Sequence, residues 1–106
     1  MRSVVVQPEA AREAEDAVAW YEDKEPGLGL HFLHDLDVLY ARMARNPEIF
    51  QSVGASFRRA LMRKFPYAIF YEFSQKMVVV HSIFHCSRKP RDWKMRLEKT
   101  QKPRGS

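Results

Sequence analysis

Two histidines and a cysteine near residue 85 are the side chains best suited to chemistry in this chain. Imidazole titrates near neutrality, so His85 could act as a general acid or base; the alternative is a histidine that forms a hydrogen bond at the edge of the core. His81 lies four residues earlier on the same predicted strand, which places both rings on one face but roughly 13 Å apart. The two rings therefore cannot share a metal ion, and Cys86 points to the opposite face without an activating base. We expect no metal, no cofactor and no thiol nucleophile.

Basic and aromatic side chains alternate along residues 57–64 and the strand that follows. The alternation places Arg59 and Arg63 on one face of the strand and Arg58 on the other. Guanidinium groups beside tyrosine rings could bind phosphate while the rings stack on bases. The alternative is a basic strand that neutralises the acidic helices of the same molecule. The residues predicted to bind a nucleic acid or another target here are Arg58, Arg59, Tyr67 and Tyr71.

A second basic stretch runs from residue 88 to residue 96. Arg88 and Arg91 could clamp phosphates, because guanidinium groups match phosphate oxygens in a fork. Trp93 could stack on a base or anchor the C-terminal segment to the sheet. Anchoring is the more frequent role of such a tryptophan.

Charge divides the chain into two unequal halves. The 106 residues carry a net charge of +5. Residues 1–50 hold five Lys/Arg against ten Asp/Glu, a net −5, whereas residues 51–106 hold thirteen against three, a net +10. A basic half on one small domain favours a polyanionic partner, either a nucleic acid or an acidic protein segment, over a merely solvated face. Because no apolar run approaches about 18 residues and no signal peptide is recognised, we expect a cytoplasmic protein without membrane contact.

The hydrophobic periodicity predicts strands and helices in a definite order. It predicts a strand over residues 2–6, a helix over 8–24, a break at Glu25-Pro26-Gly27 and a second helix from Leu28 to Asn46-Pro47. After a loop to residue 56, strands are predicted over 57–62, 65–73 and 77–85, followed by a short helix over 92–99. We therefore predict an α+β fold, β-α-α-β-β-β in two layers, with a helical hairpin on a small antiparallel sheet. The opposite face of the sheet is expected to be left for water or a partner.

The domain is expected to span residues 1–98 as a single unit. Residues 99–106 are expected to form a flexible basic tail, because they are polar and follow the last predicted helix.

Several short motifs, in this order and at this spacing, resemble the RelE/ParE superfamily of type II toxin–antitoxin toxins. The chain looks most similar to the ParE-like branch, often labelled plasmid stabilisation proteins. The motifs are Trp20-Tyr21-Glu22, Pro26-Gly27-Leu28-Gly29, Phe32, Asn46-Pro47, Arg58-Arg59-Ala60-Leu61, Phe65-Pro66-Tyr67-Ala68-Ile69-Phe70-Tyr71-Glu72 and His85-Cys86-Ser87-Arg88-Lys89-Pro90-Arg91-Asp92-Trp93.

The resemblance implies a small bacterial toxin that a cognate antitoxin holds inactive in a hetero-oligomer. RelE-like members are mRNA interferases, which cleave mRNA on the ribosome without a metal, whereas ParE-like members bind and poison DNA gyrase. RelE-like enzymes have an arginine at the position of Ala68, and its loss counts against cleavage. A minimal ribonuclease site would have His85 as its acid/base, with Arg63 and Arg88 on the phosphate and Tyr67 against a base.

Three hypotheses remain open from the sequence. The first is a ParE-like toxin that binds gyrase. The second is a ribosome-dependent endoribonuclease that uses His85, Arg63 and Arg88. The third is a relative that is no longer toxic and only forms a complex with its partner.

Overall fold

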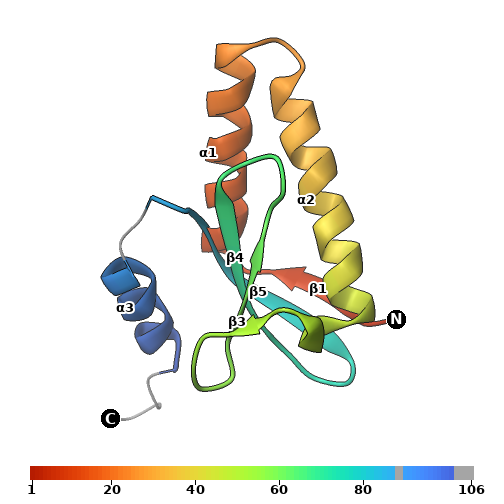
Figure 1. Cartoon of the computed structure of the whole chain (residues 1–106), viewed down its shortest axis with the longest axis vertical. Helices are drawn as coiled ribbons and strands as arrows, with labels where there is room; N and C mark the ends of the chain where they lie inside the picture. Colours follow the sequence, from red (N-terminus) through yellow and green to blue (C-terminus); the bar gives the residue numbers. More distant parts are fainter. Residues whose placement is uncertain (88–89, 102–106) are drawn as a thin grey trace.

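The computed structural model describes residues 1–87 and 90–101 and contains three α-helices and five strands (Figure 1). In chain order the elements are β1 (Ser3–Val6), α1 (Pro8–Lys24), α2 (Leu28–Arg45), the 3₁₀ turn η1 (Pro47–Ile49), β2 (Gln51–Ser52), β3 (Arg58–Leu61), β4 (Tyr67–Phe73), β5 (Met77–His85) and α3 (Pro90–Gln101). Residues 99–101, predicted to begin a flexible tail, are instead part of α3. Arg88 and the rest of that predicted tail, from residue 102 onward, lie outside the described residues. No helix among the described residues is long and apolar enough to cross a membrane.

The two long helices form the predicted antiparallel hairpin. Pro8 begins α1, where a missing N–H costs nothing, and the break at residues 25–27 separates the helices. Gly27 adopts a φ of +91°, a conformation that glycine accepts without strain. The Glu22 carboxylate then accepts hydrogen bonds from the N–H groups of Gly27, at 2.8 Å, and of Gly29, at 3.0 Å. The end of α1 thus caps the first turn of α2, which has no capping side chain of its own.

The sheet has the strand order β1-β5-β4-β3-β2. The predicted antiparallel meander of β3, β4 and β5 is confirmed, and β4 lies between the other two. β1 pairs with β5 in parallel, from Ser3 opposite Met77 to Val6 opposite Val80, so the sheet is mixed rather than purely antiparallel. The loop predicted before residue 57 contains the short strand β2, which pairs with β3.

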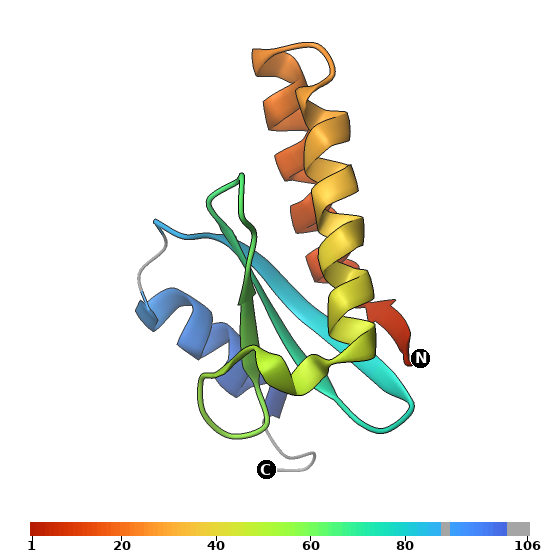
Figure 2. The same ribbon diagram turned by 45° about the vertical axis from the view of Figure 1, so that its right-hand side comes forward.

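Both faces of the sheet are covered, contrary to the expectation of one open face. Figure 2 shows the sheet between the helical hairpin and α3. The larger core lies on the hairpin side, where Phe32 and Leu36 of α2 pack over Ile69 and Val80. On the other side, Leu97 of α3 is buried in a smaller cluster with Phe57, Ala68, Phe70 and Phe84. The sequence predicted α3 but not its position against the sheet. The amphipathic pattern of α3 is weak, because among its described side chains only that of Leu97 is deeply buried.

A β-bulge in β5 changes which face each histidine occupies. Phe70 pairs with Ser82 and Tyr71 pairs with Val80, so His81 has no partner in the ladder. The extra residue shifts the alternation by one position. His81 therefore lies on the α3 side against Phe57, whereas His85 lies on the hairpin side against Tyr67. The prediction that both histidines share a face was wrong because strict alternation does not survive a bulge.

We predict that Gly29→Ala destabilises the protein by about 1–3 kcal/mol. An alanine Cβ at this position would lie 2.6 Å from the carbonyl oxygen of Val18, a backbone atom that cannot rotate away. The intrinsic helix propensity of alanine offsets about 1 kcal/mol of that cost, but the helices must still move apart. Urea denaturation measures the change. Leu30→Ala, at a side chain 68% exposed on the same helix, is the control and should change stability by less than about 0.5 kcal/mol. Equal stabilities of the wild type and Gly29→Ala would contradict the close approach of the two helices.

Candidate functional site

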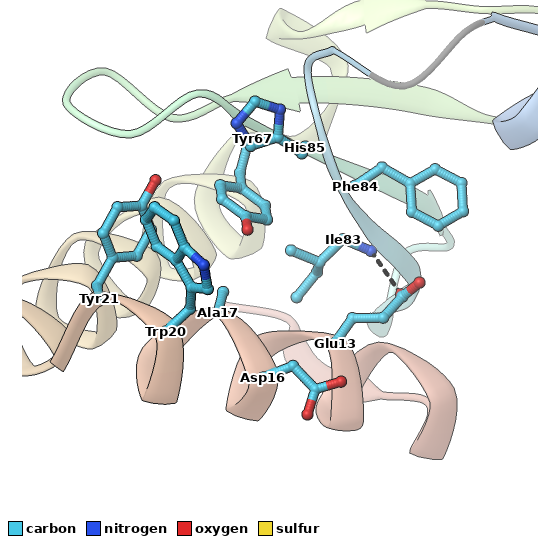
Figure 3. A pocket seen from close by; sticks show the side chains of 9 residues that line it. All are labelled: Glu13, Asp16, Ala17, Trp20, Tyr21, Tyr67, Ile83, Phe84 and His85. Atoms are coloured by element: carbon cyan, nitrogen blue, oxygen red, sulfur yellow. Dashed lines mark hydrogen bonds between the residues drawn. The ribbon is translucent and has the colours of Figure 1, made fainter. Parts of the chain in front are cut away.

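A hollow of about 430 Å³ opens between α1 and the ends of β4 and β5 (Figure 3). His85 ends β5 and pairs in the ladder with Tyr67, the first residue of β4. Their ring centres lie 5.2 Å apart in an edge-to-face arrangement. Trp20 and Tyr21 line the hollow from α1. The structure thus brings two of the predicted site residues together, His85 and Tyr67.

Aromatic packing fixes the α1 wall of this hollow. Tyr21 stacks on Phe32 with ring centres 5.6 Å apart and contacts Phe65 edge-on at 4.8 Å. Burial raises the pKa of Tyr21, and burial together with the neighbouring Tyr21 raises the pKa of Tyr67. Both phenols are therefore neutral at physiological pH and can act as hydrogen-bonding groups but not as bases.

Trp20 is the functional-site residue that the periodicity analysis missed. It lies outside the apolar stripe of α1, and its side chain is 56% exposed. The ring packs edge-on against Tyr21 at 5.0 Å, and the Lys24 ammonium group lies 4.7 Å from the ring centre. A large aromatic side chain on the polar face of an amphipathic helix was the sequence signal for an exposed binding residue.

A backbone hydrogen bond defines the tautomer of the His85 ring. The N–H of Ser87 donates to Nδ1 of His85 at 3.0 Å. Nδ1 therefore holds a lone pair, and in the neutral ring the proton is on Nε2. In this tautomer Nε2 is a donor and Nδ1 is already occupied, so the ring has no free lone pair with which to accept a proton from an attacking hydroxyl. The arrangement fits a positioned hydrogen-bond donor better than a general base.

Carboxylates lie along the edge of the hollow that is formed by the first half of α1. Glu13 accepts a hydrogen bond from the N–H of Ile83 at 2.9 Å and binds the guanidinium of Arg96 at 3.0 Å and 3.3 Å. Asp16, almost one helical turn further along, is exposed. Of the described residues that line the hollow, none is a lysine or an arginine. The edge is therefore acidic, which disfavours a phosphate group beside His85.

Arg58 and Arg59 hold neighbouring parts of the chain onto β3. Arg58 donates to the carbonyl oxygens of Glu48 and Phe50, at 3.1 Å and 2.7 Å. Arg59, on the other face, donates to the side chain of Gln51 at 2.6 Å. These contacts supply a structural role for both guanidinium groups, and their binding of an external target stays a prediction.

Tyr71 differs most from its predicted role. Its side chain is fully buried beneath the helical hairpin, so it offers no surface on which a base could stack. Its hydroxyl donates to the carbonyl oxygen of Pro47 at 2.5 Å. The alternation of β4 had correctly placed Tyr71 on the face of Tyr67, but the helices cover that face except at its end.

Arg63 lies by a different groove from His85. Together with Lys64 it follows β3 and borders a groove against α2, where Arg42 contributes a third cation. His85 and Arg63 line separate hollows, so the proposed pairing of the two around one phosphate is not assembled in this structure. Arg88 falls outside the described residues, as do the side chains of Arg91 and Trp93, and their roles stay predictions. No group of three His, Cys, Asp or Glu suited to a metal ion occurs in the described part of the chain.

The comparisons with known proteins support the fold. Neither protein-family models nor curated protein sequences give a match. A solved structure described as a chromosomal ParDE TA system from P. aeruginosa contains a chain of similar fold, with a TM-score of 0.69 and 15% sequence identity. The alignment covers 80% of this chain and 96% of that chain. The predicted α+β fold is thus confirmed: two helices packed on a five-stranded mixed sheet, an architecture similar to that of the chain in this ParDE structure.

We predict that the contribution of Tyr71 to stability reverses in alkaline solution. Burial, with a smaller effect of Glu48 and against the effect of Arg58, raises the pKa of Tyr71 to about 12. At neutral pH, Tyr71→Phe should cost about 1 kcal/mol, because the Pro47 carbonyl loses its hydrogen bond. The folded-state pKa lies above the unfolded-state value, so the unfolded chain releases the proton first. The difference in the free energy of unfolding between the wild type and the variant therefore keeps its full value below about pH 10. Above that pH it falls by about 1.4 kcal/mol per pH unit up to about pH 12.

Guanidinium denaturation of both proteins at pH 7, 9, 10 and 11 measures this difference. Comparing the two proteins cancels the titration of the other tyrosines and the lysines. A difference in stability that stays constant up to pH 11 would contradict the burial of the Tyr71 hydroxyl.

Proposed function

We propose that this protein is the toxin of a type II toxin–antitoxin system and arrests growth by binding DNA gyrase in the cytoplasm. The observation that carries the proposal is the likeness of fold to a chain of a ParDE system, 96% of which is covered. The order and spacing of the motifs quoted above agree with this likeness. A cognate antitoxin is the expected partner, and a toxin–antitoxin hetero-oligomer is the expected stored form.

Binding is favoured over RNA cleavage by the surroundings of His85. Cleavage by attack of a 2′-hydroxyl needs preorganised positive charge around the phosphate and a free base beside the nucleophile. The hollow has the carboxylates of Glu13 and Asp16 at its edge instead, and Nδ1 of His85 is occupied by a backbone N–H. Ala68, at the position of the arginine of RelE-like enzymes, is buried under α3. These features support a toxin that acts without chemistry of its own.

The groove beside α2 has the features that an antitoxin segment would need. Its apolar surface includes Val38, 48% exposed, and Leu61, 53% exposed. Arg42, Arg63 and Lys64 border the same groove and outnumber its one carboxylate, Asp35. An exposed apolar strip flanked by cations fits an amphipathic helix or strand with acidic residues at its edges. We propose that the antitoxin binds here.

The first prediction of this function is growth arrest with intact mRNA. After brief induction of the free protein, primer extension on translated messages should show no new cuts. Purified protein should inhibit supercoiling of relaxed plasmid by gyrase. His85→Gln should retain both effects, because His85 is assigned no proton transfer. Cuts within codons that disappear in His85→Gln would instead establish a ribosome-dependent endoribonuclease, and unrestricted growth would identify a complex-forming relative without toxicity.

The second prediction concerns neutralisation by the antitoxin, taken as the product of the adjacent small gene. Leu61→Glu combined with Arg63→Glu should weaken the complex at least about tenfold, because it buries a charge and reverses another. Isothermal titration calorimetry measures the affinity. Ile49→Glu, at a side chain 56% exposed outside the groove, is the matched control and should bind normally. An unchanged affinity of the double variant, with the fold intact by circular dichroism, would place the antitoxin elsewhere.

A further inference from the structure

The hollow between α1 and the ends of β4 and β5 has a lining that suits a cation rather than a phosphate. Aromatic rings come from Trp20, Tyr21 and Tyr67, and carboxylates come from Glu13 and Asp16. We propose that this hollow binds the positively charged side chain of a protein partner, specifically an arginine. This surface is distinct from the groove beside α2, and the proposal does not depend on the toxin function.

Trp20 provides the surface on which a guanidinium group would stack. Its ring is 56% exposed, and the Lys24 ammonium group 4.7 Å from its centre shows that the ring attracts a cation from its own helix. Figure 3 shows the indole standing up from α1 beside Tyr21 and facing the space toward Tyr67 and Ile83. A flat guanidinium group can lie against an aromatic ring in a way that a compact ammonium group cannot, which favours arginine over lysine.

The acidic edge supplies the opposite charge. Glu13 already binds Arg96 and the N–H of Ile83, so the carboxylate available to a partner is that of Asp16. Asp16 forms no hydrogen bond or ion pair with any residue that the structure describes. It lines the hollow just over one helical turn before Trp20, and Figure 3 shows its carboxylate at the outer side of α1. The geometry therefore offers a ring to stack on and a carboxylate to pair with on one helix face.

The hollow is large enough to receive a long side chain from a partner. Its volume of about 430 Å³ exceeds that of one long side chain, and its outer rim is open to solvent. A partner backbone can stay outside while the end of an arginine reaches Tyr67 and His85. The oxygen of the neutral phenol of Tyr67 can then accept a hydrogen bond from the guanidinium group at the inner end.

The test is a titration of the full chain, labelled with ¹⁵N, with N-acetyl-arginine amide followed by NMR. The indole N–H signal of Trp20, assigned by comparison with Trp20→Phe, should shift with a millimolar dissociation constant. N-acetyl-citrulline amide, the uncharged analogue of the same shape, should cause at most a small shift. By this signal, Asp16→Asn should weaken binding about 3-fold. Trp20→Ala lacks the indole signal and is followed through the backbone amide signal of Ala17, which lines the hollow; it should also bind about 3-fold more weakly. Binding to the wild type should weaken at 0.5 M salt.

Asp23→Asn is the matched control, because it removes an exposed acid of α1 that does not line the hollow. Its affinity for the arginine derivative should equal that of the wild type. Equal responses to arginine and citrulline, or equal losses in Asp16→Asn and Asp23→Asn, would overturn the proposal. Much tighter binding of spermidine than of the arginine derivative would also overturn it, because the ligand would then be a free polyamine. None of these readouts involves toxicity, so failure here is separate from failure of the proposed function.

Discussion

The contact between Glu13 and Arg96 joins the three layers of this small domain. β1 ends at Val6, so the part of β5 beyond the bulge has no neighbouring strand on that edge. The Glu13 carboxylate accepts the hydrogen bond from the N–H of Ile83 that a neighbouring strand would otherwise accept. The same carboxylate binds Arg96 of α3, which also donates to the His81 carbonyl oxygen at 2.8 Å. Hydrogen bonds to charged groups contribute about 2 kcal/mol each, and these are only partly exposed to solvent.

This arrangement determines what surrounds the candidate site. Because Glu13 accepts the hydrogen bond of Ile83, a carboxylate of α1 lies at the edge of the hollow beside the end of β5. Arg96 forms ion pairs with Glu13 and Glu9. Its guanidinium group is therefore occupied by carboxylates of the same chain rather than available to the phosphate of a ligand. The bulge at His81 then decides that His85, and not His81, faces the hollow. The groups that surround His85 are thus determined by the Glu13–Arg96 contact between the layers and by the bulge at His81.

Local periodicity was enough to predict the helices and the three long strands, but not the contacts between distant parts of the chain. The strand ending at His85 and the helix over 8–24 have the predicted bounds, since each carries a clear apolar pattern and a clear break. The parallel pairing of β1, the bulge and the position of α3 depend on residues far apart in sequence. Glu13 and Arg96 are separated by 83 positions, and neither belongs to the motifs on which the family resemblance rests. At the site, His85 was predicted for its imidazole near the end of a strand and Tyr67 as an aromatic ring beside basic residues. Trp20 was missed because it lies on the polar side of a helix.

The basic excess of the second half of the sequence has two parts. Some charged side chains bind groups of their own chain, and the others are available on the surface. Arg58, Arg59 and Arg96 all bind groups of their own chain, which accounts for part of the basic excess of residues 51–106. What remains on the described surface is arranged by side: three cations and one carboxylate, Asp35, border the groove beside α2, whereas only carboxylates border the hollow beside α1. A single fold therefore presents two flanks of opposite sign on one helical hairpin. Net charge alone predicted one polyanionic partner, but the distribution of side chains favours contacts of both signs, which protein partners can provide and a nucleic acid alone cannot.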